Sequence, residues 1–339
     1  MSNDVEEFFR DCPGETTDVE KIVQQFIDRQ RDSSGQLTRP IVCVTSGGTI
    51  VPLEQHCVRF IDNFSGGTRG ALSAEQFLLA GYAVIFLNRR HSIQPFTKGF
   101  PSGQILDFLT DVLEPDAAPL HGVHVTESAS ELVSDCVSRA KEAAAQGVLL
   151  RIPFETLFEY LQCLRVISAE LRPWGRRAAF YLAAAVSDFY IPWSSMVEHK
   201  IQSADLGDGL TLTLQKVPKM LGALRSEWAP EAFLISFKLE TDDRILISKA
   251  SKSIARYGVH AVVANILEKR KEVVQLVRPA AVASSGSCQP AANSGACHEA
   301  SSEGVQVDEI LRGKETFIEA PLVSRIVQLH EQYQQEANQ

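Results

Sequence analysis

Short apolar runs alternate with longer segments of helical periodicity along most of the chain. Runs of strand length lie at residues 40–45, 82–87, 178–184, 233–237, 261–264 and 272–277. Between them, apolar residues recur every three or four positions at residues 19–29, 68–80, 128–146, 154–171, 243–257 and 316–334. This alternation predicts an α/β fold: a doubly wound, Rossmann-like, mostly parallel sheet with helices on both faces.

Four segments depart from this alternation. Residues 1–38 are predicted to form an N-terminal helical arm, which leaves one α/β domain over residues 39–335. Residues 91–125 are irregular and are expected to hold an insertion. A small β-hairpin is expected after residue 188, with 211–215 as one of its strands. Residues 280–304 are rich in Ala, Ser and Gly without periodicity, which is typical of a flexible loop.

Composition narrows the function classes. Hydrophobic residues make up 45% of the 339 residues and charged residues 22%, enough apolar material for a large core. The net charge of −9 argues against a non-specific nucleic-acid binder, whose binding surface would be basic. It does not argue against a local basic pocket for a phosphorylated substrate.

The apolar runs, the first ten residues and the cysteines together predict the cellular location. The longest apolar runs are about half the roughly 20 residues that a membrane helix needs, and the acidic first ten residues do not resemble a secretory signal. The seven cysteines are odd in number and scattered, without a Cys-x-x-Cys pair. We therefore expect a cytoplasmic protein without a membrane partner.

Glycine-rich and polar segments follow the predicted strands. Residues 46–49 and 59–70 carry glycines at 47, 48, 66, 67 and 70, and residues 65–68 open a predicted helix. Glycine turns and a free helix N-terminus suit a bound triphosphate, although turn formation alone also explains each glycine. Neither a P-loop nor an uninterrupted Gly-x-Gly-x-x-Gly is present.

Polar residues at later strand ends add candidates for ligand contact. Asp188 follows the small residues 183–185 and could anchor a ligand or simply cap a turn. Four lysines could neutralise phosphate charge, although a lone lysine is usually a solvated surface residue: Lys200, Lys216, Lys219 and Lys238. No His, Asp and Glu grouping has convincing metal-ligand spacing.

Taken together, these segments resemble the phosphopantothenoylcysteine synthetase family, in its free-standing, ATP-using eukaryotic form. The matching residues run in family order at 44–49, 58–65, 183–190, 198–203, 235–241 and 262–267. The resemblance implies a ligase of coenzyme A biosynthesis. In this reaction 4′-phosphopantothenate attacks the α-phosphate of ATP with Mg²⁺ present, and cysteine then displaces AMP from the acyl-adenylate.

The resemblance also implies roles for individual residues. Nucleotide contacts are implied for Gly47, Ser65, Gly67, Gly70, Phe237 and Asn265. Phosphopantothenate contacts are implied for Asn63, Ala184, Ala185 and Asp188, with Asn63 also orienting the acyl intermediate. It further implies a homodimer, built on the hairpin, in which Arg59 enters the neighbouring subunit's site.

Two departures from the bacterial pattern leave choices open. Residues 200–203 lack the bacterial lysine run, so the activating cation is Lys200, Lys238 or Lys216, and the metal ligands are not identified. Residues 237–241 match the form that accompanies ATP use, not CTP use. The alternatives are a catalytically weakened nucleotide-binding regulatory relative and an NAD(P)-dependent oxidoreductase, which the missing dinucleotide fingerprint disfavours.

Overall fold

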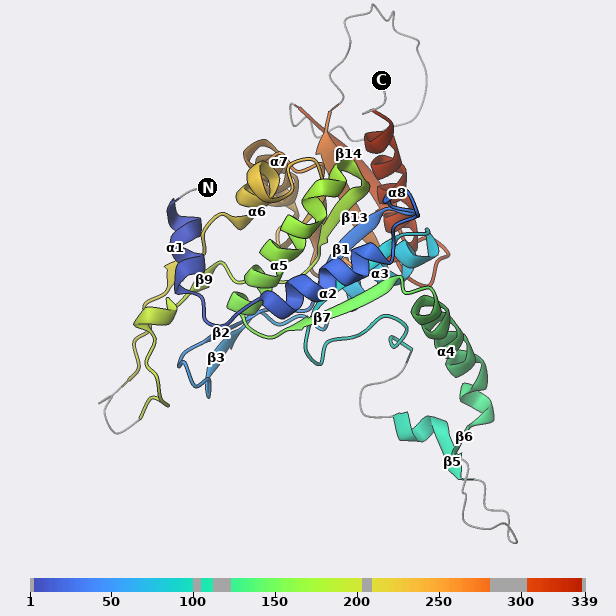
Figure 1. Cartoon of the computed structure of the whole chain (residues 1–339), viewed down its shortest axis with the longest axis horizontal. Coiled ribbons are helices and arrows are strands. Elements are labelled where there is room, and N and C mark those ends of the chain that lie inside the picture. Colours follow the sequence, from blue (N-terminus) through green and yellow to red (C-terminus); the bar gives the residue numbers. More distant parts are fainter. Residues whose placement is uncertain (1–2, 100–104, 112–122, 203–208, 281–303, 337–339) are drawn as a thin grey trace, which may run out of the picture.

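One large sheet with helices on both of its faces organises the protein (Figure 1). The computed structural model describes residues 3–99, 105–111, 123–202, 209–280 and 304–336. The sheet has eight strands in the order β14-β13-β12-β11-β8-β1-β4-β7. Their bounds are β1 Ile41–Ser46, β4 Ala83–Arg89, β7 Leu149–Phe154, β8 Ala178–Leu182, β11 Phe233–Glu240, β12 Ala261–Ile266, β13 Val273–Pro279 and β14 Val305–Leu311.

The first six of these strands run parallel and the last two antiparallel. Numbered along the chain, the parallel strands take the order 3-2-1-4-5-6, that of a doubly wound dinucleotide-binding sheet. The order reverses between β1 and β8, where Ile41 pairs with Ala178. The predicted mostly parallel, doubly wound sheet is confirmed, and ligands in such sheets bind beside this reversal.

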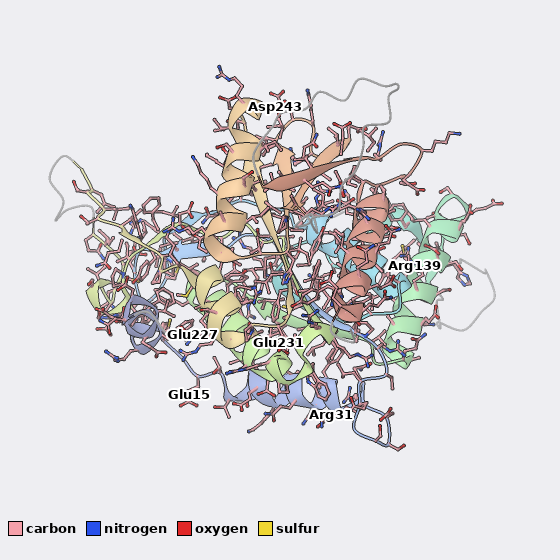
Figure 2. The ribbon with its side chains drawn as sticks, turned by 90° about the horizontal axis from the view of Figure 1, so that it is seen from above. Glu15, Arg31, Arg139, Glu227, Glu231 and Asp243 are labelled. Atoms are coloured by element: carbon pink, nitrogen blue, oxygen red, sulfur yellow. The ribbon has the colours of Figure 1, made fainter. Side chains whose placement is uncertain are left out.

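Two apolar layers hold the helices on the sheet. One face packs against α2 (Thr17–Asp28), α5 (Leu157–Leu171), α6 (Met220–Ala223) and α7 (Asp243–Tyr257). The other face packs against α3 (Thr68–Leu79) and α8 (Glu319–Gln335). In Figure 2 side chains fill the space between these layers, with Arg31 and Asp243 at opposite edges of the molecule.

The predicted arm packs onto this core. Phe8 of α1 (Asn3–Asp11) is buried and stacks on Phe158 of α5, with ring centroids 5.7 Å apart. Val23, Phe26 and Ile27 of α2 are buried in the same layer. The division of the chain at residue 38 stays a prediction.

The remaining elements lie around the sheet. The outlying strands are β2 Ile50–Pro52, β3 Phe60–Asp62, β5 Leu109–Asp111, β6 Val123–Val125, β9 Phe189–Tyr190 and β10 Gln215–Lys216. The outlying helix is α4, Ser130–Ala145, and the short helical turns are Ile105–Phe108, Glu127–Ala129, Arg172–Arg177, Trp193–Ser195 and Leu224–Trp228. None of the described helices is long and apolar enough to cross a membrane.

Two features of the strands differ from the sequence expectations, and one expectation stays untested. Strands β7 and β14, at the two edges of the sheet, were not predicted, because edge strands bury one face and lack a continuous apolar run. The hairpin strand expected at 211–215 is wrong for 211–214, since only Gln215–Lys216 pairs, with β9. Most of the expected loop, residues 281–303, lies outside the described part of the chain.

Candidate active site

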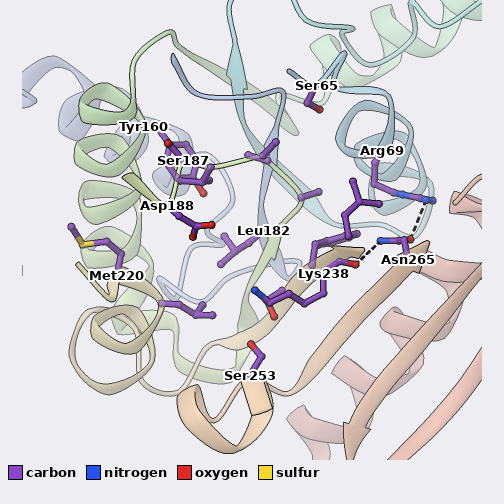
Figure 3. A pocket seen from close by; sticks show the side chains of 18 of the residues that line it. Ser65, Arg69, Tyr160, Leu182, Ser187, Asp188, Met220, Lys238, Ser253 and Asn265 are labelled. Carbon is purple, nitrogen blue, oxygen red and sulfur yellow. Dashed lines mark hydrogen bonds between the residues drawn. The ribbon is translucent and has the colours of Figure 1, made fainter. Parts of the chain in front are cut away.

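A cavity of about 750 Å³ opens at the carboxyl ends of the parallel strands (Figure 3). Its wall is formed by the N-terminus of α3, the ends of β8, β11 and β12, and residues 217–221. It therefore lies beside the reversal of strand order, where doubly wound folds bind ligands. The volume is within the range of about 300–1,000 Å³ that small-molecule sites occupy.

The N-terminus of α3 offers the cavity free backbone donors. Gly67 precedes the helix in the left-handed conformation, with φ of 79°, and no side chain caps the helix end. Ser65, Gly66, Gly67 and Thr68 line the cavity beside it. Uncapped N–H groups and the positive end of the helix dipole favour a phosphate group at this point.

Two further glycines allow the close packing that shapes this corner. Gly47 has φ of 86°, and a Cβ atom there would come within 2.6 Å of the Arg89 Cβ. A Cβ atom at Gly70 would come within 2.5 Å of Ser46, which holds α3 against β1. Neither glycine lines the cavity, so in this chain each is required by the packing behind the wall.

Five cationic side chains line the cavity, against three carboxylates. They are Arg69, Lys219, Lys238, Arg270 and Lys271. The carboxylates are Asp188, Glu240 and Glu319. The excess of positive charge suits a ligand with several negative charges.

Arg69 is the most firmly held of these cations. Its guanidinium donates to the Glu319 carboxylate at 2.9 Å and to the Asn265 side-chain oxygen at 3.4 Å. It also donates to the backbone carbonyl of Arg270. Burial raises the pKa of Glu319, and the charge of Arg69 opposes that rise. Arg69 thus ties together α3, α8 and the end of β12 at the cavity wall.

The segment after β8 is fixed by threonines of the first strand and turn. The backbone N–H of Ala184 donates to Thr45 Oγ1 at 3.1 Å, and that of Ser187 donates to Thr49 Oγ1 at 3.1 Å. The N–H of Ala185 donates to the carbonyl of Gly47 at 2.8 Å. Small side chains here leave the cavity room beside Asp188, whose carboxylate has no partner among the described residues.

Two buried hydroxyls in the wall have no partner in the described part of the chain. Ser236 of β11 is 6% exposed and Ser253 of α7 is 5% exposed, and neither Oγ atom makes a hydrogen bond there. An unpaired buried hydroxyl is unfavourable by about 1–3 kcal/mol. A polar group of a bound ligand would remove that penalty.

Comparison with known proteins decides the family. The chain is 51% identical over 278 residues to phosphopantothenate–cysteine ligase 1 of Arabidopsis thaliana, covering 80% of this chain and 84% of that protein. It is 48% identical over 246 residues to the Homo sapiens phosphopantothenate–cysteine ligase, covering 72% of this chain and 77% of that protein. The chain belongs to the phosphopantothenate–cysteine ligase family.

Other matches agree with this assignment. Residues 164–286 match the family model for the DNA/pantothenate metabolism flavoprotein C-terminal domain. A solved Cab2 mutant in complex with phosphopantothenate-cysteine superposes with a TM-score of 0.80 at 32% identity, covering 98% of this chain and 100% of that chain. The expectation of a ligase of coenzyme A biosynthesis is confirmed, and the oxidoreductase alternative is set aside.

In this ligase the structure gathers eight of the predicted site residues around one cavity: Ser65, Gly67, Ala184, Ala185, Asp188, Phe237, Lys238 and Asn265. The aromatic ring of Phe237 packs edge-on against Tyr181, with centroids 4.8 Å apart. Asn63 lies just outside the wall, where its side chain donates to the carbonyl of Thr49 at 3.3 Å.

Arg59 and Lys200 lie elsewhere, on the strand pair β2–β3 and the neighbouring segment 197–202. The Arg59 guanidinium donates to the fully buried Glu54 at 2.7 Å and to the carbonyl of Ile201 at 3.1 Å. Neither Arg59 nor Lys200 lines the cavity of its own chain. Their predicted roles stay predictions.

Sequence reasoning missed three cations and two acids of the ligase cavity, the acids being Glu240 and Glu319. Arg69 stood inside the glycine-rich segment that was singled out, in the first turn of the predicted helix, and that position could have identified it. Arg270 and Lys271 follow the predicted strand that ends near Asn265. Glu319 lies 250 residues after Arg69, and no local pattern connects the two.

Proposed function

We propose that this ligase joins 4′-phosphopantothenate to cysteine in the described cavity, using ATP and an acyl-adenylate intermediate. The observation that carries the proposal is the uncapped N-terminus of α3 beside five lining cations. Such a wall can hold two anionic substrates together and offset their mutual repulsion. Small residues and apolar side chains across the cavity would keep water from the reactive mixed anhydride.

The nucleotide would lie over the α3 side of the cavity. Ser65, Gly67 and the free N–H groups of α3 would bind its phosphates, with Gly47 and Gly70 giving this corner its shape. Phe237 would pack against the base. Asn265, whose side chain donates to the carbonyl of Lys238 at 3.4 Å, would meet the nucleotide from β12.

Phosphopantothenate would extend along the segment after β8. Ala184 and Ala185 leave space against the backbone, and the free Asp188 carboxylate can accept a hydrogen bond from a substrate hydroxyl. Asn63 would orient the acyl group, since an amide both donates and accepts. Its predicted role requires a side-chain movement away from Thr49.

Lys238 is the favoured cation for carboxylate activation. It lines the cavity without a carboxylate partner among the described residues, whereas Lys200 and Lys216 are outside the wall. A free ammonium group in a partly buried site can stabilise the negative charge that develops at the α-phosphate.

Mg²⁺ would neutralise phosphate charge and help to align the triphosphate. Among the described lining carboxylates, Glu240 is paired with Lys249 at 2.8 Å and Glu319 with Arg69. Asp188 is therefore the carboxylate available to the metal in this wall, directly or through water.

We also propose a cytoplasmic homodimer that buries the predicted hairpin, which is the pair β9–β10, together with the strand pair β2–β3. Apolar side chains are unusually exposed here: Val58, Phe60, Ile61, Phe64 and Val197 are 37–88% exposed. Several exposed apolar side chains on neighbouring segments are typical of a protein interface. In such a dimer Arg59 would exchange its contact with Glu54 for the partner's substrate phosphate.

The direct test is pyrophosphate release by the purified chain with Mg²⁺, 4′-phosphopantothenate and cysteine, comparing ATP with CTP. We expect release with ATP well above CTP, and full turnover only when both other substrates are present. The Asn63→Ala variant should lose most of this turnover while keeping the fold, as judged by circular dichroism.

Three results would change the proposal. Release mainly with CTP would keep the ligase and overturn the ATP assignment. Full activity of Asn63→Ala would remove that residue from the site. Nucleotide binding without pyrophosphate release would favour a non-catalytic regulatory relative.

A further inference from the structure

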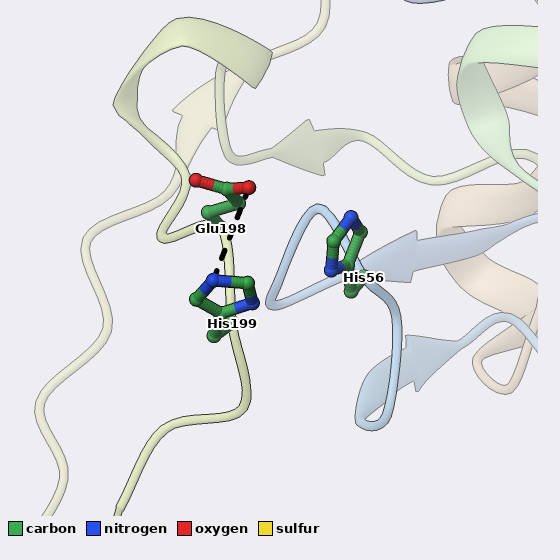
Figure 4. A group of neighbouring side chains, drawn as sticks. All are labelled: His56, Glu198 and His199. Atoms are coloured by element: carbon green, nitrogen blue, oxygen red, sulfur yellow. Dashed lines mark ion pairs between the residues drawn. The ribbon is translucent and has the colours of Figure 1, made fainter.

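A group of metal-ligating side chains lies on the surface, away from the cavity. His56, Glu198 and His199 come from two segments that are far apart in the chain and side by side in space (Figure 4). All three are exposed. None of them lines the cavity, and the proposed ligase reaction uses none of them.

The backbone beneath this group is firmly held. The N–H of His56 donates to the carbonyl of Glu198 at 2.9 Å, and the N–H of Gln55 donates to the carbonyl of Val197 at 2.9 Å. Below them the buried carboxylate of Glu54 accepts from the backbone of Arg59 at 2.9 Å and from that of Ile201 at 3.3 Å. The two segments are thus fixed together independently of any ligand.

The three side chains converge on one point above this frame. One potential ligand atom from each lies within 4.8 Å of the others. The His199 Nε2 and Glu198 Oε1 atoms are 3.9 Å apart, and the imidazole rings of His56 and His199 have centroids 5.2 Å apart. Ligand atoms around a tetrahedral Zn²⁺ stand about 3.4 Å apart, given metal–ligand bonds of about 2.0–2.2 Å.

We propose that His56, Glu198 and His199 form a binding site for a divalent transition ion of the zinc class. Two imidazoles and one carboxylate are a ligand set that suits Zn²⁺ better than the oxygen-seeking Mg²⁺ or Ca²⁺. The ligand atoms must come closer by up to about 1.4 Å, and because the side chains are exposed, rotation about their own bonds can supply this. Water fills the remaining coordination position.

A metal ion here acts as a clamp between two segments. It joins His56 to Glu198 and His199. These belong to the same two segments that the Glu54 carboxylate connects through the backbone N–H groups of Arg59 and Ile201. The clamp therefore strengthens the attachment of the strand pair β2–β3 to the segment after β9. This effect does not depend on the nucleotide or on turnover.

The test is a titration of the full-length chain, without a polyhistidine tag, with Zn²⁺ against a chromophoric chelator. We expect one ion per chain, a higher thermal midpoint with Zn²⁺, and slower hydrogen exchange over residues 53–59. Co²⁺ in place of Zn²⁺ should give the visible absorption of a low-coordinate site. His56→Ala and His199→Ala should each weaken binding by on the order of 100-fold, since each removes one of three protein ligands.

His124→Ala is the matched control, because His124 is exposed on β6, an element that lies well away from the strand pair β2–β3 in Figure 1. That variant should bind Zn²⁺ as the unmodified chain does. The proposal is overturned by the absence of stoichiometric binding, or by equal affinity in His56→Ala and His124→Ala. Half an ion per chain would also overturn it, since one ion would then be shared by two chains.

Discussion

The two ends of the parallel strands carry polar side chains in very different states. At the amino ends, two buried histidines find hydrogen-bond partners inside the protein. The His330 ring lies 2.8 Å from the Tyr82 hydroxyl through Nδ1 and 2.8 Å from the carbonyl of Arg176 through Nε2. His260 Nδ1 accepts from the backbone N–H of Leu234 at 2.9 Å.

At the carboxyl ends, four polar side chains of the cavity lack such partners among the described residues, beside others that are paired. The hydroxyls of Ser236 and Ser253 are buried and unpaired in the described part of the chain, and the Lys238 and Asp188 side chains have no ion-pair partner there. The amino and carboxyl ends belong to the same strands of one sheet and follow the same packing rules. Hydrogen bonds completed inside the protein stabilise the fold, whereas incomplete ones indicate where a ligand binds.

The sharpest test of this contrast is Lys238→Met, which removes one positive charge from the carboxyl ends of the parallel strands. We expect kcat/KM to fall by about 10²–10³-fold, as for loss of one preorganised electrostatic group. Without ligands the free energy of unfolding should change by less than about 1 kcal/mol. Steady-state pyrophosphate release and urea unfolding measure the two effects.

Lys252→Met, on the exposed surface of α7, is the control and should change neither quantity. If Lys200→Met abolished turnover while Lys238→Met preserved it, the activating cation would belong to the segment 197–202, outside the cavity wall of its own chain. The unpaired charge of Lys238 at the carboxyl ends of the strands would then have no catalytic role.

The buried histidines at the amino ends of the strands should make the stability of the fold sensitive to acid. Burial lowers the pKa of His330 from its usual value of 6.5 to about 4, and burial together with nearby Arg225 lowers that of His260 to about 3. Below pH 6.5 the unfolded chain therefore binds protons that the folded chain does not. The free energy of unfolding should fall by about 2–3 kcal/mol between pH 6.5 and pH 5, measured by urea unfolding.

His330→Gln separates this effect from general acid sensitivity. Glutamine keeps polar atoms near Tyr82 but does not titrate, so the fall between pH 6.5 and pH 5 should shrink by about half. Carboxylates whose pKa is lowered in the folded protein, such as Glu54 and Asp308, also make the free energy of unfolding fall with acid. They do so only at lower pH, where the carboxylates become protonated. An equal pH dependence in both proteins would exclude His330 as the source.

The smallest expected effect concerns the unpaired hydroxyls. Ser236→Ala should leave the ligand-free stability unchanged or raise it by up to about 1 kcal/mol, because no hydrogen bond is lost. Its KM for one substrate should rise by about 2–10-fold, the value of one hydrogen bond to a ligand. Urea unfolding and substrate titration measure both quantities.

Ser73→Ala provides the matched comparison. The Ser73 hydroxyl is buried and lies 2.8 Å from the hydroxyl of Tyr181, which the variant leaves unpaired. It should lower the free energy of unfolding by about 1–2 kcal/mol. A similar loss in Ser236→Ala would mean that Ser236 has a partner within the protein.

The order of buried strands and helices was readable from the sequence. Strands β1, β8 and β12 are continuous apolar runs because both of their faces are covered, and their hydrophobic pattern is local. Helix α7 was predicted with its observed bounds, since Asp242 caps its start and Gly258 ends it in the left-handed conformation. Edge strands β7 and β14 were missed because one face of each is exposed.

The cavity was only partly readable. Glycines and small residues at strand ends marked Ser65, Gly67 and Ala184, since these positions follow from the doubly wound topology. The Arg69–Glu319 pair could not be predicted, because it depends on how α8 returns across the sheet. The unpaired state of Ser236 likewise depends on the surrounding packing, which sequence periodicity does not describe.

The pairing of Arg69 with Glu319 has a consequence for synthesis of the protein. The two residues are 250 positions apart, so a ribosome working at about 5–20 residues per second makes the acid roughly 12–50 s after the arginine. During that interval the strands of the large sheet that follow β1, from β4 to β14, are synthesised while the arginine has no carboxylate from α8. The sheet face that α8 later covers is therefore exposed on the nascent chain. A chaperone that binds exposed apolar surface could bind this face until α8 docks.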